Sequence, residues 1–152
     1  MTSHSITRSN IRHLYADIFW FGILGGSAIA FLNVYAARLG ASALQIGLLT
    51  AGPAVVNLLV SLPAGRWLKG QPLVPVSFWA SLVGRAFYLA FIFLPWLLDA
   101  SAQVVAIIVL TFLMAIPLTP LGVGFNALFA EAVPERYRAH VAGIRNIMLA
   151  VM

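Results

Sequence analysis

The sequence contains no cysteine and few charged side chains. Without cysteine, the chain can form neither a disulfide framework nor a thiolate metal site. Charged residues make up only 9% of its 152 residues, whereas 62% are hydrophobic, and its mean hydropathy is +0.98. A water-soluble globule needs more polar surface than this composition provides. The composition therefore predicts an integral membrane protein whose main partner is the lipid bilayer.

Chemically reactive groups are also scarce. The four acidic residues are scattered along the chain, and none of the three histidines has a second ligand at metal-binding spacing. The sequence shows no nucleophile–base pair and no phosphate-binding glycine loop. We therefore expect no enzyme activity, no metal site and no cofactor. Basic residues outnumber acidic ones by nine to four, but they form no cluster interleaved with aromatic residues, so we expect no nucleic-acid partner.

Long apolar runs dominate what remains. Four of them are each longer than the ~20 residues that cross a hydrocarbon core of ~30 Å; they cover residues 14–37, 43–65, 72–98 and 103–130. The sequence thus predicts an all-α membrane protein with four transmembrane helices. A fifth run begins near Val141 and is too short to cross before Met152. We expect a cytoplasmic N-terminal segment at 1–13 and an incomplete transmembrane domain over 14–152, which is part of a longer protein.

The distribution of Lys and Arg predicts the orientation. If the four runs cross in alternation, one side of the membrane carries seven of the nine basic residues, namely Arg8, Arg12, Arg66, Lys69, Arg136, Arg138 and Arg145. Arg38 then lies on the other side, and Arg85 lies within a span. Cytoplasmic loops carry the excess of positive charge. We therefore expect the N-terminus in the cytoplasm and the chain in the cell membrane.

Small and polar residues mark one face of each span. In the first run, Gly22, Gly26 and Ala30 repeat every four residues and predict a seam that packs closely against another helix. Asn33 continues this face. Asn57 in the second run and Asn126 in the fourth lie on similar polar faces. These faces favour a shared interior between the spans.

Arg85 is the one charge near the middle of the run 72–98. A charge at the centre of a spanning helix costs ~2.5–3.5 kcal/mol on insertion scales, so such residues usually face a cavity or a partner. Two interpretations stay open: a cavity cation that meets an anionic substrate group or a carboxylate, and a structural arginine that binds neighbouring helices. The candidate substrate-cavity residues are Arg85, Asn57, Ser81, Tyr88, Asn33 and Asn126.

Two stretches carry a family resemblance. SLPAGRWLKGQPL (61–73) follows the second run, and EAVPERYRAHVAGIRN (131–146) follows the fourth. They resemble cytoplasmic loops of the major facilitator superfamily, the first its loop between helices two and three and the second its basic loop between helices four and five. NIRHLYADIFWFG and LGASALQIGLLTAGPA, which lead into the first two runs, are similar in layout. The resemblance covers essentially the whole chain.

The first loop departs from the family at one point. Gly65 and Arg66 match the start of the family's motif, but Leu68 and Lys69 stand where an Asp-Arg pair is usual. Glu131 is the candidate for the missing carboxylate. The loop residues that the resemblance singles out are Gly65, Arg66, Lys69, Glu131, Arg136 and Arg138.

The resemblance implies a secondary active transporter of twelve spans in two six-helix halves, which moves a small solute by alternating access. This chain would hold four helices and the start of a fifth of the N-terminal half. Its partners would be the remaining spans and a small-molecule substrate, which the sequence does not name. A second interpretation stays open: a small four-span membrane protein that acts as a homo-oligomeric transporter or as an assembly or scaffold subunit.

Overall fold

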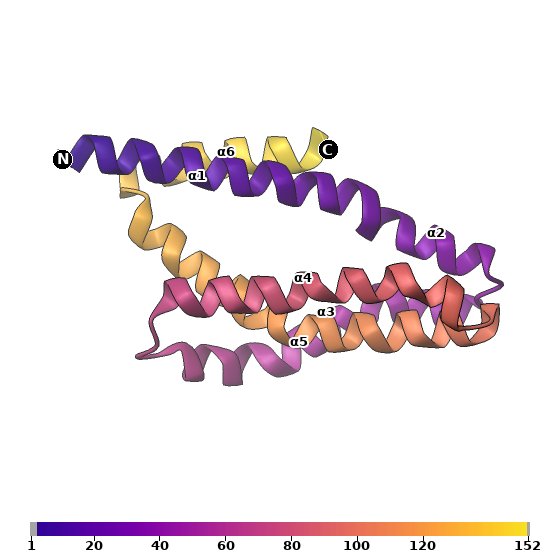
Figure 1. Cartoon of the computed structure of the whole chain (residues 1–152). Coiled ribbons are helices and arrows are strands. Elements are labelled where there is room, and N and C mark those ends of the chain that lie inside the picture. Colours follow the sequence, from indigo (N-terminus) through magenta and orange to yellow (C-terminus); the bar gives the residue numbers. More distant parts are fainter. Residues whose placement is uncertain (1–2, 152) are drawn as a thin grey trace. The chain divides into compact units, whose positions relative to one another are not determined.

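The computed structural model describes residues 3–151, and the side chains of residues 9–151. Within that range the protein is all-helical, with 92% helix and no strand. Its elements are α1 (Ser3–Leu24), the π-helix η1 (Gly25–Ile29), α2 (Ala30–Arg38), α3 (Ala43–Leu68), α4 (Leu73–Leu97), α5 (Ala100–Ala132) and α6 (Glu135–Val151) (Figure 1). Four stretches are long and apolar enough to cross a membrane: Ser9–Arg38, Ala43–Leu68, Leu73–Leu97 and Ala100–Ala132. The chain therefore has the four apolar helices of an integral membrane protein, as expected.

The helix ends differ in two places from the expected ones. Within the expected N-terminal segment, α1 already begins at Ser3; residues 1–2 and the side chain of Arg8 lie outside the described part of the chain. At the other end, α6 begins at Glu135 rather than near Val141. Pro134 directly precedes α6, and its carbonyl accepts a hydrogen bond from the Tyr137 N–H at 2.9 Å. The carbonyl of the N-cap residue accepts the first hydrogen bond of a helix, so Pro134 is the N-cap residue of α6.

The chain divides into two compact units, residues 1–32 with 127–152 (unit 1) and residues 33–126 (unit 2). In unit 2, a short connection joins α2 to α3, and its residues cap the end of α2 and the start of α3. Gly40 has a φ of 90°, and the Gly40 and Ala41 N–H groups donate back to Ala37 and Ala36, which is a Schellman motif. Ser42 then forms a reciprocal capping box with Gln45. Specific hydrogen bonds therefore cap both the end of α2 and the start of α3.

The connection between α3 and α4 is a type II turn. Lys69 has φ −62° and ψ 118°, Gly70 has a φ of 84°, and the Gln71 N–H donates to the Leu68 carbonyl at 3.1 Å. Position three of such a turn requires a positive φ, which glycine adopts without strain. The glycine after Lys69 therefore permits the chain to reverse directly from α3 into α4.

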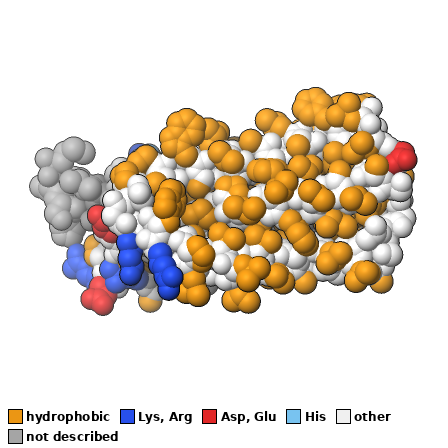
Figure 2. All heavy atoms as spheres, turned by 90° about the horizontal axis from the view of Figure 1, so that it is seen from below, with side chains coloured by type: hydrophobic (Ala, Val, Ile, Leu, Met, Phe, Trp, Pro, Cys, Tyr) orange, Lys and Arg blue, Asp and Glu red, His pale blue; other side chains and the backbone are white. Residues whose placement is uncertain are grey.

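Helix α5 is the centre of unit 2. It contacts α2 through the Tyr35–Gln103 hydrogen bond. It contacts α3 where Gly52 faces Phe112, and α4 where Gly84 faces Leu118; a Cβ on either glycine would overlap that side chain. The buried residues of α5 are Gln103, Val104, Ile107, Thr111, Met114, Ala115, Thr119 and Gly124. Elsewhere hydrophobic side chains remain at the surface, and Figure 2 shows them spread over much of one face.

In unit 1, α1 packs against α6. The buried hydrophobic side chains of this unit include Ile18, Val133 and Val141. Helix α1 continues into η1, where the Ser27 hydroxyl donates to the Ile23 carbonyl at 2.6 Å. A π-helical turn holds one more residue than an α-helical one. The first span is therefore wound differently over Gly25–Ile29 from a continuous α-helix.

Candidate functional site

The candidate cavity residue Asn57 is joined to α5 near the middle of both helices. Thr119 Oγ1 lies 2.5 Å from Asn57 Oδ1 and 2.8 Å from the Ala115 carbonyl oxygen. A hydroxyl carries one proton and can donate to only one of these oxygens. If it donates to Ala115, a turned Asn57 amide can donate to Oγ1 in its place. Thr119 is buried, whereas the Asn57 residue is largely exposed, so this pair is a polar contact at the edge of the α3–α5 packing.

The polar residues of α4 share one side of that helix; they are Ser77, Ser81, Tyr88 and Arg85. At about 100° per residue they lie within a sector of about 80° beside Gly84, the residue that faces α5. Ser77 Oγ is buried with no hydrogen-bond partner among the described residues. Ser81 and Tyr88 are half-buried and Arg85 is exposed. The polar stripe therefore runs from the α5 contact to an exposed guanidinium, a group that can bind carboxylate or phosphate with two hydrogen bonds.

The two remaining cavity candidates are less constrained. Asn33 in α2 is half-buried, and Asn126 in α5 is exposed. Neither side chain forms a hydrogen bond with another described residue. The expected packing seam of the first span is split: Gly22 is buried, whereas Gly26 and Ala30 are exposed.

A polar cluster that the sequence analysis did not single out lies at one end of unit 2. Gln103 is only 7% exposed; its Oε1 accepts from the Tyr35 hydroxyl at 2.6 Å and its Nε2 donates to the Leu98 carbonyl at 2.9 Å. One side chain thus connects α2, the end of α4 and the start of α5. A glutamine in an apolar run was the available signal, but the sequence does not show which groups it reaches.

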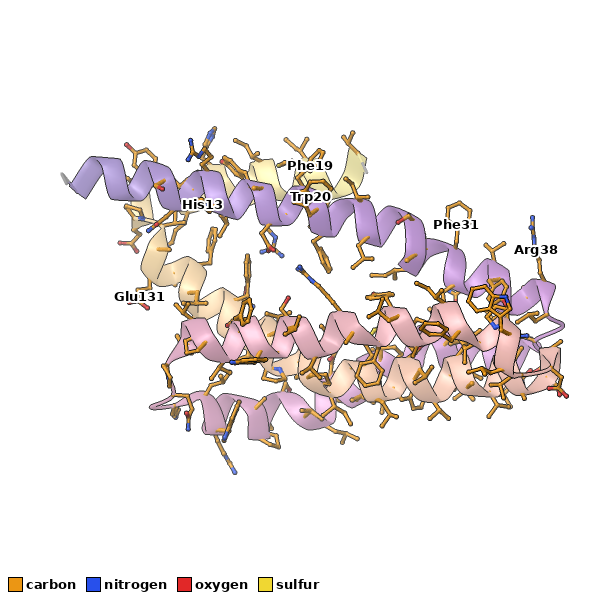
Figure 3. The ribbon with its side chains drawn as sticks, viewed as in Figure 1. His13, Phe19, Trp20, Phe31, Arg38 and Glu131 are labelled. Atoms are coloured by element: carbon orange, nitrogen blue, oxygen red, sulfur yellow. The ribbon has the colours of Figure 1, made fainter. Side chains whose placement is uncertain are left out.

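Asp99 begins α5 beside this cluster. Its Oδ1 accepts from the Ala102 N–H at 2.8 Å and from the Ser101 hydroxyl at 3.2 Å. This is the N-cap arrangement that Asp favours, and its negative charge suits the positive end of the helix dipole. Arg38, at the same end, is exposed and points away from α3, α4 and α5 (Figure 3).

The loop residues of the family resemblance fall in both units. In unit 2, Gly65 is half-buried in α3, and Arg66 and Lys69 are exposed at its C-terminal end. In unit 1, Glu131 and Arg136 are exposed, and no ion pair joins them in the described part of the chain. The Arg136 guanidinium instead lies over the Tyr137 ring at 4.7 Å, which is within the range of a cation–π contact.

Arg138 has a defined partner in unit 1. Its Nε donates to the Val133 carbonyl at 3.1 Å, and its guanidinium also donates to the Ala130 carbonyl. The last carbonyls of a helix have no partners within the helix and carry partial negative charge. Arg138 therefore caps the C-terminal end of α5 from the first turns of α6.

The candidate groups differ in the chemistry that they can offer. In the described residues no three His, Asp or Glu side chains gather as a metal site would require. Near mid-span the helices offer the Arg85 guanidinium together with amides and hydroxyl groups, which bind polar or anionic groups by hydrogen bonds. Comparisons with known protein families, with curated proteins and with solved structures give no match.

Proposed function

We propose that this chain is the N-terminal portion of a secondary active transporter of the major facilitator type, which moves a small solute by alternating access. The observation that carries the proposal is the polar stripe of α4, which places Arg85 at the middle of an apolar spanning helix. An intramembrane charge commonly marks a substrate or ion pathway. The Asn57–Thr119 pair supports it as a second polar contact near mid-span.

The proposed orientation follows from the basic residues. The α3–α4 turn with Arg66 and Lys69, and the α5–α6 connection with Arg136 and Arg138, lie on the cytoplasmic side together with the N-terminus. The remaining spans of such a transporter complete the central site as partners of this chain. Within the site, Arg85 contacts an anionic group of the substrate, and Asn57, Ser81 and Tyr88 provide further hydrogen bonds.

Water access to the α4 stripe tests this proposal. The chain has no native cysteine, so Ser81→Cys introduces a single thiol on the stripe, and Val83→Cys introduces one at similar depth on the opposite side. Thiols react as thiolates, which need water. We expect a charged methanethiosulfonate reagent to modify the Ser81→Cys protein about tenfold faster than the Val83→Cys protein. Equally slow reactions would contradict a water-accessible pathway.

Replacing Arg85 then separates its two interpretations. Arg85→Leu removes the charge, so membrane insertion should be at least as efficient as for the unmodified protein. A cavity role predicts that the amount of folded protein stays the same in detergent and that transport by the complete protein is lost. Arg85→Lys should retain insertion and still reduce transport, because an ammonium lacks the planar fork of donors. Loss of the folded protein on Arg85→Leu would instead assign Arg85 to helix packing.

A further inference from the structure

The C-terminal end of α3 presents two cations and an indole to the surroundings. Arg66 lies in the last turn of the helix, and Lys69 occupies the second position of the type II turn. Both residues are exposed, and Trp67 between them is 55% exposed. Figure 2 shows Lys and Arg side chains gathered toward one end of the face that it presents. The turn fixes the backbone here, so these side chains project from a defined site rather than from a long loop.

No carboxylate within unit 2 neutralises these cations. The only acidic residue in 33–126 is Asp99, which belongs to the opposite end of the unit and caps α5. Neither the Arg66 nor the Lys69 side chain forms an ion pair with another residue that the structure describes. The end of α3 therefore keeps two uncompensated positive charges within its unit.

The length of α3 places this end at the depth of lipid headgroups. Its 26 residues extend about 39 Å at about 1.5 Å per residue, compared with a hydrocarbon core of about 30 Å. The helix is therefore long enough for its C-terminal end to reach beyond the hydrocarbon. Tryptophan prefers this interfacial layer, and the phosphates of anionic lipids lie in it. Trp67, Arg66 and Lys69 match the layer in both polarity and charge.

We propose that the α3–α4 turn is a binding site for the headgroup of an anionic phospholipid. Arg66 and Lys69 bind the phosphate from two directions, and the Trp67 ring lies at the glycerol level beside the acyl chains. Arginine offers a planar fork of donors to a phosphate, and lysine adds a compact charge. This site is independent of the transporter proposal, because a scaffold subunit with the same helix end would bind the same lipid.

The fluorescence of Trp67 can show which lipid occupies the proposed site. Replacement of Trp20, Trp79 and Trp96 by Phe leaves Trp67 as the single indole. The purified chain is reconstituted in two kinds of phosphatidylcholine vesicle. One contains a minor fraction of acyl-brominated phosphatidylglycerol, and the other contains the same fraction of acyl-brominated phosphatidylcholine. The quenching of Trp67 fluorescence is then compared between the two. We expect brominated phosphatidylglycerol to quench about twofold more strongly, with the preference lost at high salt. Equal quenching by both lipids at low salt would overturn the proposal.

Matched variants identify the residues responsible. Arg66→Gln with Lys69→Gln should make the two lipids quench equally, whereas the charge-preserving exchange Arg66→Lys with Lys69→Arg should keep the preference. Arg38→Gln, at the other end of unit 2, should also keep it. Circular dichroism checks the folding of each variant. If the glutamine variant does not fold, the salt dependence of the starting protein decides: a preference that persists at high salt contradicts charge recognition.

Discussion

Helices α4 and α5 are both long and apolar, yet only α5 is a packing centre. In the most apolar 18-residue window of each, 33% of α5 is buried and only 6% of α4. α4 exposes large aromatic side chains, namely Phe78, Trp79, Phe93 and Trp96. α5 buries small and hydroxyl-bearing residues, among them Thr111, Ala115, Thr119 and Gly124. Two helices of similarly apolar composition therefore differ within one unit: α5 packs against its neighbours, and α4 exposes most of its surface.

The difference between α4 and α5 shows which sequence features determine helix packing in a membrane protein. Lipid is as apolar as a leucine side chain, so hydrophobicity alone does not distinguish a lipid-facing surface from an interior one. Close approach of backbones and hydrogen bonds between helices distinguish them instead. Gly52 and Gly84 provide the close approach to α5, and Tyr35 and Asn57 provide the hydrogen bonds.

The largest expected effect comes from filling the α3–α5 contact. Gly52→Leu places a branched side chain where a Cβ would already overlap the rigid Phe112 ring. We expect a loss of about 3 kcal/mol of stability and little folded protein in detergent extracts. Size-exclusion chromatography and thermal unfolding of the purified protein measure both quantities.

The matched control for this substitution lies on the same helix. A Cβ at Gly47 would meet no atom within 4 Å, so Gly47→Leu should leave the folded amount unchanged. Adding Phe112→Ala to a Gly52→Ala variant should cost less stability than the sum of the two single substitutions, since the ring that blocks the Cβ is then gone. Equal stability of the Gly52→Leu and Gly47→Leu proteins would mean that α3 does not pack on α5 at this point.

An identical substitution on each helix tests the comparison directly. Ile107 in α5 is 0% exposed and Ile92 in α4 is 55% exposed. Ile107→Ala leaves a cavity among packed side chains and should cost about 2 kcal/mol. Ile92→Ala should lower the stability by much less than Ile107→Ala, because lipid or detergent fills the space that the side chain leaves. Thermal unfolding in one detergent gives both values, and a larger loss for Ile92→Ala would reverse the assignment of the two helices.

The hydrogen bond between α2 and α5 should have the next largest effect. Tyr35→Phe removes the donor and leaves the buried Gln103 Oε1 unsatisfied, at a cost of about 1–3 kcal/mol. Tyr137→Phe removes a hydroxyl from an exposed tyrosine and should be neutral. Urea or thermal titration of both variants compares them. If the two tyrosines prove equally dispensable, Gln103 finds another donor, such as water.

The smallest expected effect concerns the C-terminal end of α5. Arg138→Gln removes the donors that satisfy the Ala130 and Val133 carbonyls and should lower stability by about 0.5–1 kcal/mol. Arg136→Gln, which makes no such contact, is the control. Amide hydrogen exchange at residues 129–133 provides a local readout. Faster exchange in the Arg138 variant alone is the expected result, and unchanged exchange would contradict the cap.

The spanning helices could be predicted from the sequence because they depend on composition and length. The apolar runs, interrupted by polar or glycine-containing segments near residues 40, 70 and 99, locate the connections. Asn57 was also recognisable, since an amide in an apolar run needs a hydrogen-bond partner. Its partner Thr119 lies in the fourth run, but the pairing of the two required the structure.

The packing details could not be predicted because each depends on a second helix. The repeated spacing of Gly22, Gly26 and Ala30 indicated a seam, yet the glycines that face α5 are Gly52 and Gly84, which belong to no such repeat. What makes them close contacts is the position of Phe112 and Leu118. The π turn of η1 likewise has no distinctive sequence signal.

The Tyr35–Gln103 bond also determines which motions are open to α5. If α5 slid along α2 by one helical turn, the Tyr35 hydroxyl and the Gln103 amide would move apart by about 5.4 Å. The bond would break, and the buried amide oxygen would lose its donor. Tilting about this end leaves both partners within reach of each other. The Tyr35–Gln103 bond therefore fixes the position of α5 along α2, and the contacts at Phe112, Leu118 and Thr119 hold the middle of α5 against α3 and α4.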